Sequence, residues 1–571
     1  MSGGWRTLSD TLRAVTSAFL TRFLTGDLPA ILIVSALLTW PVSWGLLGLY
    51  RRAVRRSMRR DGGATPMSVD SASAPAAAAA TIAAAPALDS APENAARLLN
   101  ELLTLRWRAA RVYLAAAIAY AFIIAVVMAW VADPEAPFRP VRLLLLTTNF
   151  AWPAVLALGI VAGATRRQRI LIAIAYAMLY AVLIGVGVWR SPTTSGGQLL
   201  TLWALNNLPS TVLVLFCLSR PIRAVGPLIL LVLTVSLCGA DLCIALVGSR
   251  DSFIRAAVQL GDLIGLEGAG TLLAVGVTGF LVLGIVGAAL LFWIARQYER
   301  KQVSDESLTI HTLWWLFVFG HAIGLAFENV AAPLIGVAAM IVFTVVSRIG
   351  LARWSRGAGS GHRLLLLRSF SIGARAERFF DAFQKHWRRT GSIEMIAGFD
   401  LAARTIEPHE FLDFITGTVS RRFIAGRAAL DQRLREMDTR PDRDGRFRVN
   451  EFFCYNDTWR EVLLALVHHA DAVLMDLRGF SHENAGCVFE IGELFSLVPL
   501  GRIVFLVDEG TDLPFLHETF AAAAAAAGIT VSEQLCVLNC PTLDSRTLRT
   551  VLAAVANAVY CPARQTVTTS R

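Results

Sequence analysis

Long apolar runs alternate with short polar segments along the first part of the chain and then stop. The runs of membrane-spanning length cover residues 28–50, 112–132, 143–164, 170–189, 199–219, 225–247, 270–295, 308–327 and 330–347. Each is close to the ~20 apolar residues that cross a hydrocarbon core as a helix. The pattern predicts a polytopic α-helical membrane domain of about nine spans. Only Glu328 and Asn329 separate the last two runs, so a tight hairpin and a re-entrant pair both stay open.

From residue 357 onward, short apolar runs alternate with stretches of helical periodicity, which is typical of repeated βα units. The predicted strands cover residues 363–368, 393–399, 472–477, 503–507 and 535–538, and the predicted helices cover residues 375–389, 409–437, 458–469, 487–497, 514–527 and 545–559. Runs such as 364–367 contain no alternating polar positions, which is typical of parallel strands covered on both faces. The sequence therefore predicts an α/β domain with a flavodoxin-like, doubly wound parallel sheet of strand order 2-1-3-4-5.

Composition divides the chain into four parts. Residues 1–60 hold an amphipathic segment and the first span, and residues 61–95 form an Ala/Pro/Ser run with too few large apolar side chains to order itself, so we expect a disordered linker. Residues 96–356 form the multi-span domain and residues 357–571 the α/β domain. Leucines share one helical face over residues 93–108, and we expect this stretch to lie along the membrane interface.

Arginines gather at alternate ends of the apolar runs. The chain is 55% hydrophobic and 17% charged with a net charge of +10, and its densest basic group is Arg51, Arg52, Arg55, Arg56, Arg59 and Arg60. Because cytoplasmic loops are enriched in Lys and Arg, this distribution predicts a bacterial inner-membrane protein with a cytoplasmic C-terminal domain. It indicates the lipid bilayer as the partner of this charge and excludes nucleic acid. The cysteines show no CxxC spacing, so we expect reduced thiols and no metal site.

Ligand sites of doubly wound sheets lie beyond the carboxyl ends of the strands, where the strand order reverses. In the predicted order that point lies between the strands 363–368 and 472–477. The loop after the first strand offers Arg368, Ser369 and Ser371 to a phosphate group, or uses them to cap the following helix. Asp476 and Arg478 end the second strand, where they contact a ligand or form a salt bridge that fixes the loop.

The segment around the second loop carries a resemblance to known families. It contains Ala470-Asp471, an apolar strand, Asp476, a short loop, and then Gly486-Cys487-Val488-Phe489-Glu490-Ile491-Gly492-Glu493-Leu494. This pattern resembles the nucleoside 2-deoxyribosyltransferases and, more loosely, the Toll/interleukin-receptor-like NAD hydrolases. Most of the α/β domain is also similar to a bacterial family of uncharacterised multi-span membrane proteins, through Leu365-Leu366-Leu367-Arg368-Ser369-Phe370 and, further on, Asp457, Trp459 and Val462.

The transferase resemblance implies a catalytic role for Glu490, because the family's glutamate at the start of this helix attacks the anomeric carbon of the sugar. The family's Ser-x-Gly-Thr loop is replaced here by Asn484-Ala485-Gly486-Cys487, so a hydroxyl donor is missing and catalysis is less supported than nucleotide binding. Apart from the resemblance, a carboxylate in the first turn of a helix beside a switch point is placed to stabilise an oxocarbenium ion or to accept ribose hydroxyls. The alternative is that Glu490, and Glu493 a turn later, only complement the helix dipole.

These observations lead to one main hypothesis and two alternatives. The main hypothesis is a membrane-tethered cytoplasmic module that binds a nucleotide- or NAD-type ligand and acts as a sensor or as an N-glycosidic-bond effector. The candidate catalytic residue is Glu490, and the candidate ligand-binding residues are Arg368, Ser369, Ser371, Asp476, Arg478, Asn484 and Glu493. The alternatives are a transporter or lipid-handling protein with a regulatory soluble domain, and a non-catalytic interaction module. No resident cofactor is expected, and a homo-oligomer stays open.

Overall fold

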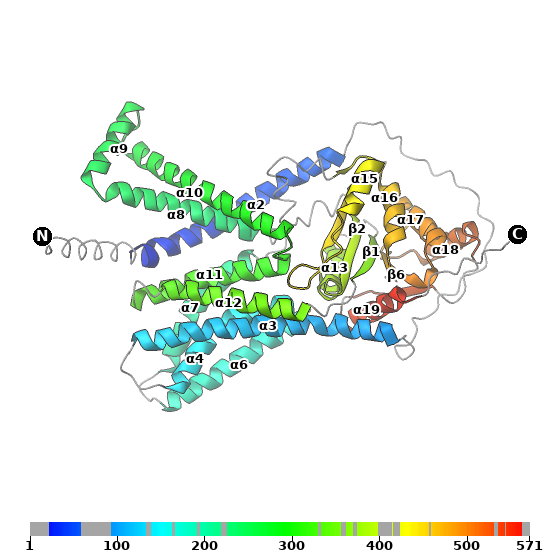
Figure 1. Ribbon diagram of the computed structural model, residues 1–571, viewed down its shortest axis with the longest axis horizontal. Helices are drawn as coiled ribbons and strands as arrows, with labels where there is room; N and C mark the ends of the chain where they lie inside the picture. The colour runs from blue at the N-terminus through cyan, green and yellow to red at the C-terminus, as the bar shows by residue number, and fades with distance from the viewer. Residues whose placement is uncertain are drawn as a thin grey trace.

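The computed structural model describes residues 22–58, 93–132, 139–162, 166–190, 195–217, 225–328, 333–355, 361–368, 374–397, 414, 423–455, 458–529, 535–542 and 544–561. Long helices lie side by side in one half of the molecule, and a mixed helix and sheet unit lies in the other half (Figure 1). We call the first the helical domain and the second the α/β domain. The predicted linker lies outside the described residues up to residue 92, and Glu93 already belongs to a helix.

The helical domain begins with a short π-helix, Phe23–Asp27, and continues with eleven described α-helices. They are α2 Leu28–Met58, α3 Glu93–Ala132, α4 Pro140–Phe150, α5 Trp152–Val161, α6 Arg166–Arg190, α7 Gly196–Cys217, α8 Gly226–Gly248, α9 Asp251–Leu263, α10 Gly268–Glu299, α11 Asp305–Glu328 and α12 Pro333–Ser355. Among the described residues, 8 helices are long and apolar enough to cross a membrane, or up to 9 if the bent pair α4 and α5 is one span. Each predicted apolar run corresponds to one of these helices or to the bent pair, which is compatible with a membrane protein.

The bend between α4 and α5 measures 46° and has a local cause. Pro153 has no N–H to donate to the carbonyl of Asn149, so the helix loses a hydrogen bond there. The Asn207 Nδ2 group donates to that carbonyl at 3.2 Å, and the Tyr176 hydroxyl donates to the neighbouring carbonyl of Thr148 at 2.8 Å. A backbone carbonyl without a partner costs several kcal/mol in an apolar medium, so these side chains make the break tolerable.

Seven parallel strands form the sheet of the α/β domain. They are β1 His362–Arg368, β2 Gly391–Ala397, β3 Phe423–Ile424, β4 Val449–Cys454, β5 Ala472–Asp476, β6 Ile503–Val507 and β7 Cys536–Asn539, in the order β3-β4-β2-β1-β5-β6-β7. The five predicted strands all occur and keep their predicted relative order, so the strand order reverses between β1 and β5. The strands β4 and β3 extend the sheet beyond β2 and were not predicted.

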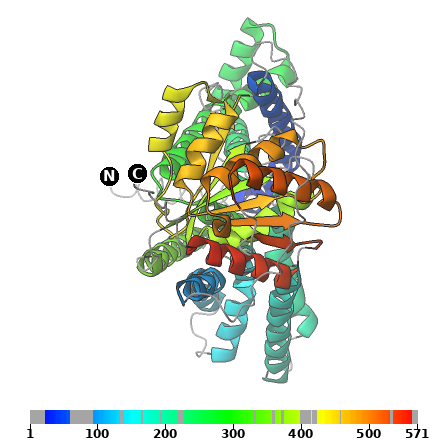
Figure 2. The same cartoon turned by 90° about the vertical axis from the view of Figure 1, so that its right-hand side faces the viewer.

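Helices cover both faces of this sheet, as the apolar strand runs predicted. Leu365, Val473 and Phe505 point to the face covered by α16 Trp459–His469, α17 Ala485–Leu497 and α18 Leu513–Ala526. Their strand neighbours Leu364 and Leu474 point to the opposite face, which α13 Ala374–Trp387 and α19 Ser545–Val559 cover. Figure 2 shows the orange helices on one side of the sheet and the red helix α19 on the other.

One predicted helix was wrong in part. Instead of a continuous helix over residues 409–437, the described residues contain β3 and then α15 Arg427–Arg435, with Gly426 between them. Phe423 and Ile424 pair with β4 through Phe453 and Cys454, and both are buried. Pairing at the sheet edge therefore overrides the helical periodicity of this stretch. Residues 409–413 and 415–422 lie outside the described residues.

Two long helices run beyond the helical domain and pack on the α/β domain. The N-terminal part of α3 buries Ala95, Leu98 and Leu102 against α13 and α19, and the His386 ring bonds to the carbonyl of Leu102 at 3.0 Å. Figure 1 shows α3 running beneath α19. The prediction of an interfacial helix at residues 93–108 was therefore wrong, because its leucine face is buried against protein. On the other side, the end of α2 packs on Phe423 and Phe453.

Candidate functional site at the junction of the two domains

The structure brings together three of the residues predicted at the carboxyl edge of the sheet. Arg368 is in register with Asp476 across β1 and β5. The Asp476 carboxylate accepts hydrogen bonds from Arg478 Nε at 2.8 Å and Nη2 at 2.6 Å. The guanidinium groups of Arg368 and Arg478 lie 5.9 Å and 4.9 Å from the rings of Phe380 and Phe379 on α13. The buried Asp476–Arg478 pair matches the salt bridge that the sequence left open as an alternative.

The loop after β5 is closed by a residue that the sequence analysis missed. Asp508, which follows β6, accepts hydrogen bonds at 3.0 Å from the backbone N–H groups of Gly479 and Gly510. Gly479 has a φ of 66°, a conformation that favours glycine. A carboxylate directly after a predicted buried strand was the signal that could have revealed it. Ser369 and Ser371 lie outside the described residues.

Glu490 lies apart from this cluster. It belongs to α17, whose Cys487, Ile491 and Leu494 pack on the face of the sheet opposite α13. The helix begins at Ala485, so Glu490 is in the second turn and not in the first, and the helix dipole does not explain it. Burial raises the pKa of its carboxyl to about 8, and within the described part of the chain its Oε2 atom has no hydrogen-bond partner.

The two remaining predicted residues flank Glu490 in the same region. Asn484 precedes α17, and its side-chain oxygen accepts a hydrogen bond from the Ser481 backbone N–H at 2.9 Å, which fixes the turn. Glu493 is half-buried on α17. The predicted residues thus divide into a cluster against α13 and a second group on α17, and no single crevice formed by both is visible among the described residues.

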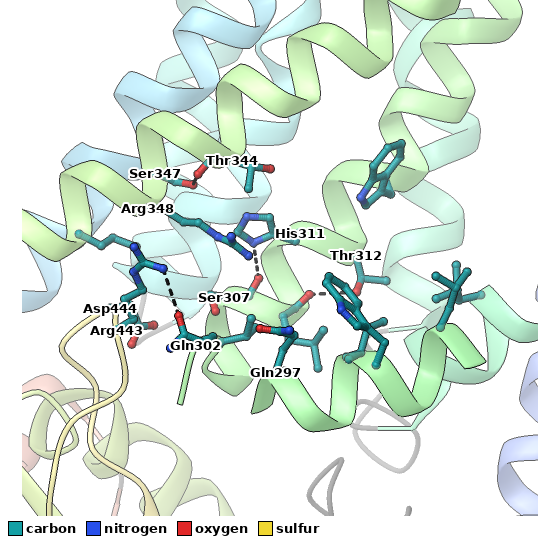
Figure 3. A pocket seen from close by; sticks show the side chains of 18 of the residues that line it. Gln297, Gln302, Ser307, His311, Thr312, Thr344, Ser347, Arg348, Arg443 and Asp444 are labelled. Carbon is teal, nitrogen blue, oxygen red and sulfur yellow. Dashed lines mark hydrogen bonds between the residues drawn. The ribbon is translucent and has the colours of Figure 1, made fainter. Parts of the chain in front are cut away.

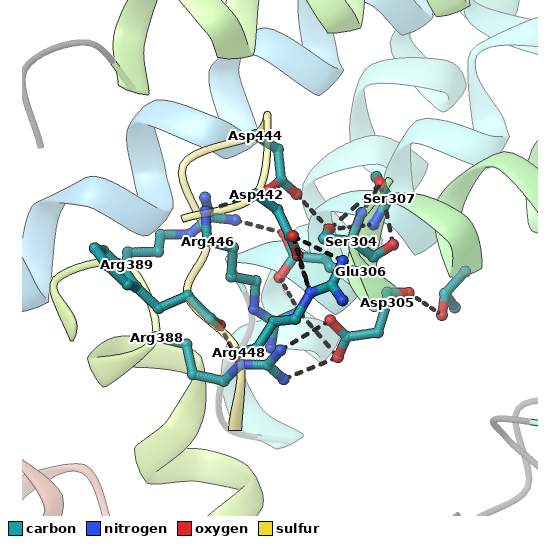
Figure 4. A network of polar contacts seen from close by, with 12 residues as sticks. Ser304, Asp305, Glu306, Ser307, Arg388, Arg389, Asp442, Asp444, Arg446 and Arg448 are labelled. Atoms are coloured by element: carbon teal, nitrogen blue, oxygen red, sulfur yellow. Dashed lines mark hydrogen bonds and ion pairs between the residues drawn. The ribbon is translucent and has the colours of Figure 1, made fainter. Parts of the chain in front are cut away.

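A network of buried charges joins the opposite edge of the sheet to the helical domain. The helix α11 begins with Asp305 and Glu306. Asp305 forms two hydrogen bonds with Arg388, of 2.9 Å and 3.0 Å, and Glu306 pairs with Arg389 at 2.5 Å. Arg446 reaches both carboxylates, at 3.5 Å and 3.3 Å (Figure 4). Arg388 and Arg389 follow α13, and Arg446 precedes β4, so this first turn of α11 is tied to two parts of the α/β domain.

The segment that contains Arg446, from Asp438 to Arg448, also contacts the end of α10. The Arg448 guanidinium pairs with Asp442 at 2.9 Å and lies 4.0 Å from the centre of the Tyr298 ring. Lys301, just after α10, pairs with Asp438 at 2.7 Å. Burial raises the pKa of Asp442 to about 7, although Arg448 beside it acts in the opposite direction. These contacts connect the end of α10 to the segment between Asp438 and Arg448.

Because these ion pairs are buried, the loss of one partner strongly destabilises the protein. The side chains of Glu306 and Arg389 are each only 7% exposed. Burial opposes the charge on Arg389, but Glu306 and Asp444 outweigh this effect and leave its pKa above the usual value. Removing one partner of such a buried pair costs ~3–5 kcal/mol, because the other charge stays buried without compensation. A displacement of α11 relative to the sheet would have a similar cost.

A cavity of about 520 Å³ lies directly beside this network, between α8, α10, α11 and α12. Its walls are mainly apolar and include Trp293, Trp315 and Phe319, whereas its polar end contains His311 and Arg348 (Figure 3). Arg443 and Asp444 of the α/β domain also line it. Asp444 accepts a hydrogen bond from Ser304, which in turn contacts Ser307 on the cavity wall. The cavity and the charged network therefore share residues.

The sequence analysis missed this junction. Asp305 and Glu306 looked like the ordinary acidic start of a helix, and the stretch from Arg440 to Arg448 was left without an element. One signal in the sequence was a pair of carboxylates at the arginine-rich end of an apolar run. Positive residues there set the membrane orientation and acidic residues contribute little to it, so the carboxylates needed another explanation. Comparison with protein-family models, with curated proteins and with solved structures found no match. The functional argument therefore depends on this geometry.

Proposed function

We propose that this protein is a membrane sensor in which the helical domain receives a signal and the cytoplasmic α/β domain responds to it. The observation that carries the proposal is the loop between Asp442 and Arg448. This loop lines the cavity through Arg443 and Asp444, pairs with α11 through Arg446, and continues directly into β4. One segment is thus in contact with the cavity, the charged network and the sheet.

The network favours transmission over independent motion. Because the Glu306–Arg389 pair and its neighbours are buried, α11 cannot slide against the sheet without leaving charges unpaired. A small shift of α10 or α11 is therefore expected to move the segment before β4 and the end of α13 together. The extensions of α2 and α3 hold the α/β domain from two sides and limit its freedom to move in other directions.

The test compares hydrogen exchange in the full-length protein with exchange in two variants. Glu306→Gln removes the carboxylate charge at the centre of the network, and Glu299→Gln removes an exposed carboxylate at the end of α10. We expect Glu306→Gln to increase exchange both in the first turns of α11 and in residues 442–454, with β7 and α19 unchanged. Glu299→Gln should change neither region. An increase confined to the helical domain would contradict the coupling.

A second candidate function concerns the response itself. The strand order reverses between β1 and β5, which is where doubly wound sheets bind nucleotides. We propose that a nucleotide- or NAD-type ligand binds at this edge, close to Arg368 and the Asp476–Arg478 pair. Catalysis by Glu490 is not part of this proposal, because α17 places Glu490 under the opposite face of the sheet. Titration of the full chain with ATP and NAD⁺ tests binding, with Arg478→Gln as the variant expected to lose it. Wild-type protein that binds neither nucleotide would refute this second candidate.

A further inference from the structure

The wall of the junction cavity is suited to an aliphatic chain. Its volume of about 520 Å³ lies within the ~300–1,000 Å³ of small-molecule sites. Leu231, Leu290 and Ile294 line it together with aromatic rings, and these residues come from helices of membrane-spanning length. Trp293 is 55% exposed and Trp315 is 37% exposed, although both line the cavity. A ligand could therefore reach the cavity from the lipid side.

The polar end of the cavity lacks a partner for its cation. Arg348 lines the cavity near the end of α12, beside His311 (Figure 3); its side chain is exposed, and among the described residues no carboxylate pairs with it. Arginine presents a planar fork of N–H donors that matches the oxygens of a phosphate or a carboxylate. An arginine at the end of a span also has a topological role, so Arg348 alone would not indicate a ligand.

His311 supplies the second, independent observation. Its Nδ1 atom lies 2.6 Å from the carbonyl oxygen of Ser307, and because a carbonyl only accepts, Nδ1 carries the proton. In the neutral ring Nε2 is then a hydrogen-bond acceptor. The His311 ring lines the cavity, and its Nε2 atom is closed off with no described residue donating to it, so a ligand donor meets Nε2 only when the ring turns towards the cavity. The polar end therefore presents a cationic donor beside a neutral acceptor.

We propose that this cavity binds a single-chain amphiphile with a phosphate headgroup. The alkyl chain lies among the tryptophans and leucines, the anionic oxygens of the phosphate meet Arg348, and its remaining P–OH donates to His311 Nε2. A carboxylate would satisfy Arg348 but has no hydrogen for Nε2, and an alcohol has no charge for Arg348. Asp444 does not oppose the phosphate strongly, because the positive charges of Arg389 and Arg446 lie close to it and offset its own charge.

The claim that this ligand signals to the α/β domain rests on the proposed function, whereas the claim that the ligand binds does not. The experiment therefore measures the two separately. Native mass spectrometry of the full-length protein released from non-ionic micelles gives the fraction bound to dodecyl phosphate, to dodecanoate and to dodecanol. Hydrogen exchange of β4, residues 449–454, which do not line the cavity, then measures transmission to the α/β domain with and without dodecyl phosphate.

The variants are chosen to separate the cavity from general membrane affinity. Thr312→Trp fills the cavity, Arg348→Gln removes the cation, and Arg353→Gln is the matched control, an exposed arginine on the same helix that does not line the cavity. We expect dodecyl phosphate to bind at least about tenfold more tightly than the two other probes, with the preference lost in Arg348→Gln and kept in Arg353→Gln. Thr312→Trp should bind none of the probes specifically.

Two results would overturn the assignment. One is equal binding of dodecyl phosphate and dodecanol by the wild-type protein, and the other is unchanged dodecyl phosphate binding in Thr312→Trp. If dodecyl phosphate binds as expected but exchange of residues 449–454 stays constant, the site stands and the proposed sensor function fails. If no probe binds while Glu306→Gln still alters exchange in both domains, the coupling stands and the ligand assignment fails.

Discussion

Replacing Glu306 by Gln should destabilise the protein by about 3 kcal/mol. The change leaves Arg389 buried without its nearest countercharge, at a position where both side chains are 7% exposed. Loss of one partner of a buried pair costs ~3–5 kcal/mol. We expect the lower end of this range, because Asp444 still lies close to Arg389, Arg446 keeps Asp305 at 3.5 Å, and the new amide still accepts a hydrogen bond.

Buried thiols provide the assay. Cys454 and Cys487 are buried in the α/β domain, so a fluorogenic maleimide reports their exposure on heating in detergent. At ~2–4 °C per kcal/mol for a unit of this size, the loss lowers the Tm by about 6–12 °C. The double variant Glu306→Gln with Arg389→Met should lose less than the sum of the single variants, because the uncompensated charge is gone. A Tm for Glu306→Gln within 2 °C of the control Glu299→Gln would refute the buried-pair argument.

Four further predictions test other parts of the structure. Burial raises the pKa of Glu490 to about 8, above its unfolded value. Its contribution to stability is therefore full at acidic pH and falls as the pH rises towards 8, by on the order of 1.4 kcal/mol per pH unit. Denaturant unfolding should show a flatter pH profile for Glu490→Gln, which should be more stable than wild type at pH 8. Leu98→Ala should cost ~2–5 kcal/mol and expose the α13 and α19 surface to protease, whereas Arg97→Ala should not. Asn207→Leu should cost ~1–3 kcal/mol by leaving the Asn149 carbonyl unpaired, with Thr201→Val as the exposed control in the same thermal assay. Reporter fusions after Arg223 should lie in the cytoplasm and fusions at Ser195 on the far side, and a cytoplasmic result at Ser195 would overturn the orientation.

The parts of the fold that the sequence revealed are those with uninterrupted apolar runs. The strand from His362 to Arg368 contains four consecutive leucines, and β5 and β6 are similarly apolar, so their period identified them as buried parallel strands. The strand β4 has the sequence VNEFFC and follows a run rich in arginine and aspartate. Its polar positions obscured it, because Asn450 and Glu451 find partners only through tertiary structure, such as the 2.9 Å bond from the Asp438 N–H to Asn450.

The candidate site was less accessible to sequence analysis than the fold. Asp305 and Glu306 are more than eighty residues from Arg388 and Arg389 and still further from Arg446, and no periodicity links segments so far apart. The cavity needs the mutual packing of four helices, which hydrophobicity alone does not determine. Conversely, the motif that placed Glu490 beside Asp476 was based on the order of residues along the chain. In the structure Asp476 lies on the face of the sheet that α13 covers, and α17 covers the opposite face. The face to which a strand residue points depends on the pleat of the strand.

The central claim is that the helical domain and the sheet respond as one unit through the junction, and a cavity-filling variant tests it most directly. Hydrogen exchange of β4, residues 449–454, should differ between Thr312→Trp and wild type, although Thr312 lies on α11 and β4 does not line the cavity. In the Glu306→Gln background, Thr312→Trp should produce no further change in that segment. If Thr312→Trp alters exchange only within α10, α11 and α12, or alters residues 449–454 equally with and without the Glu306 carboxylate, the junction does not transmit the signal.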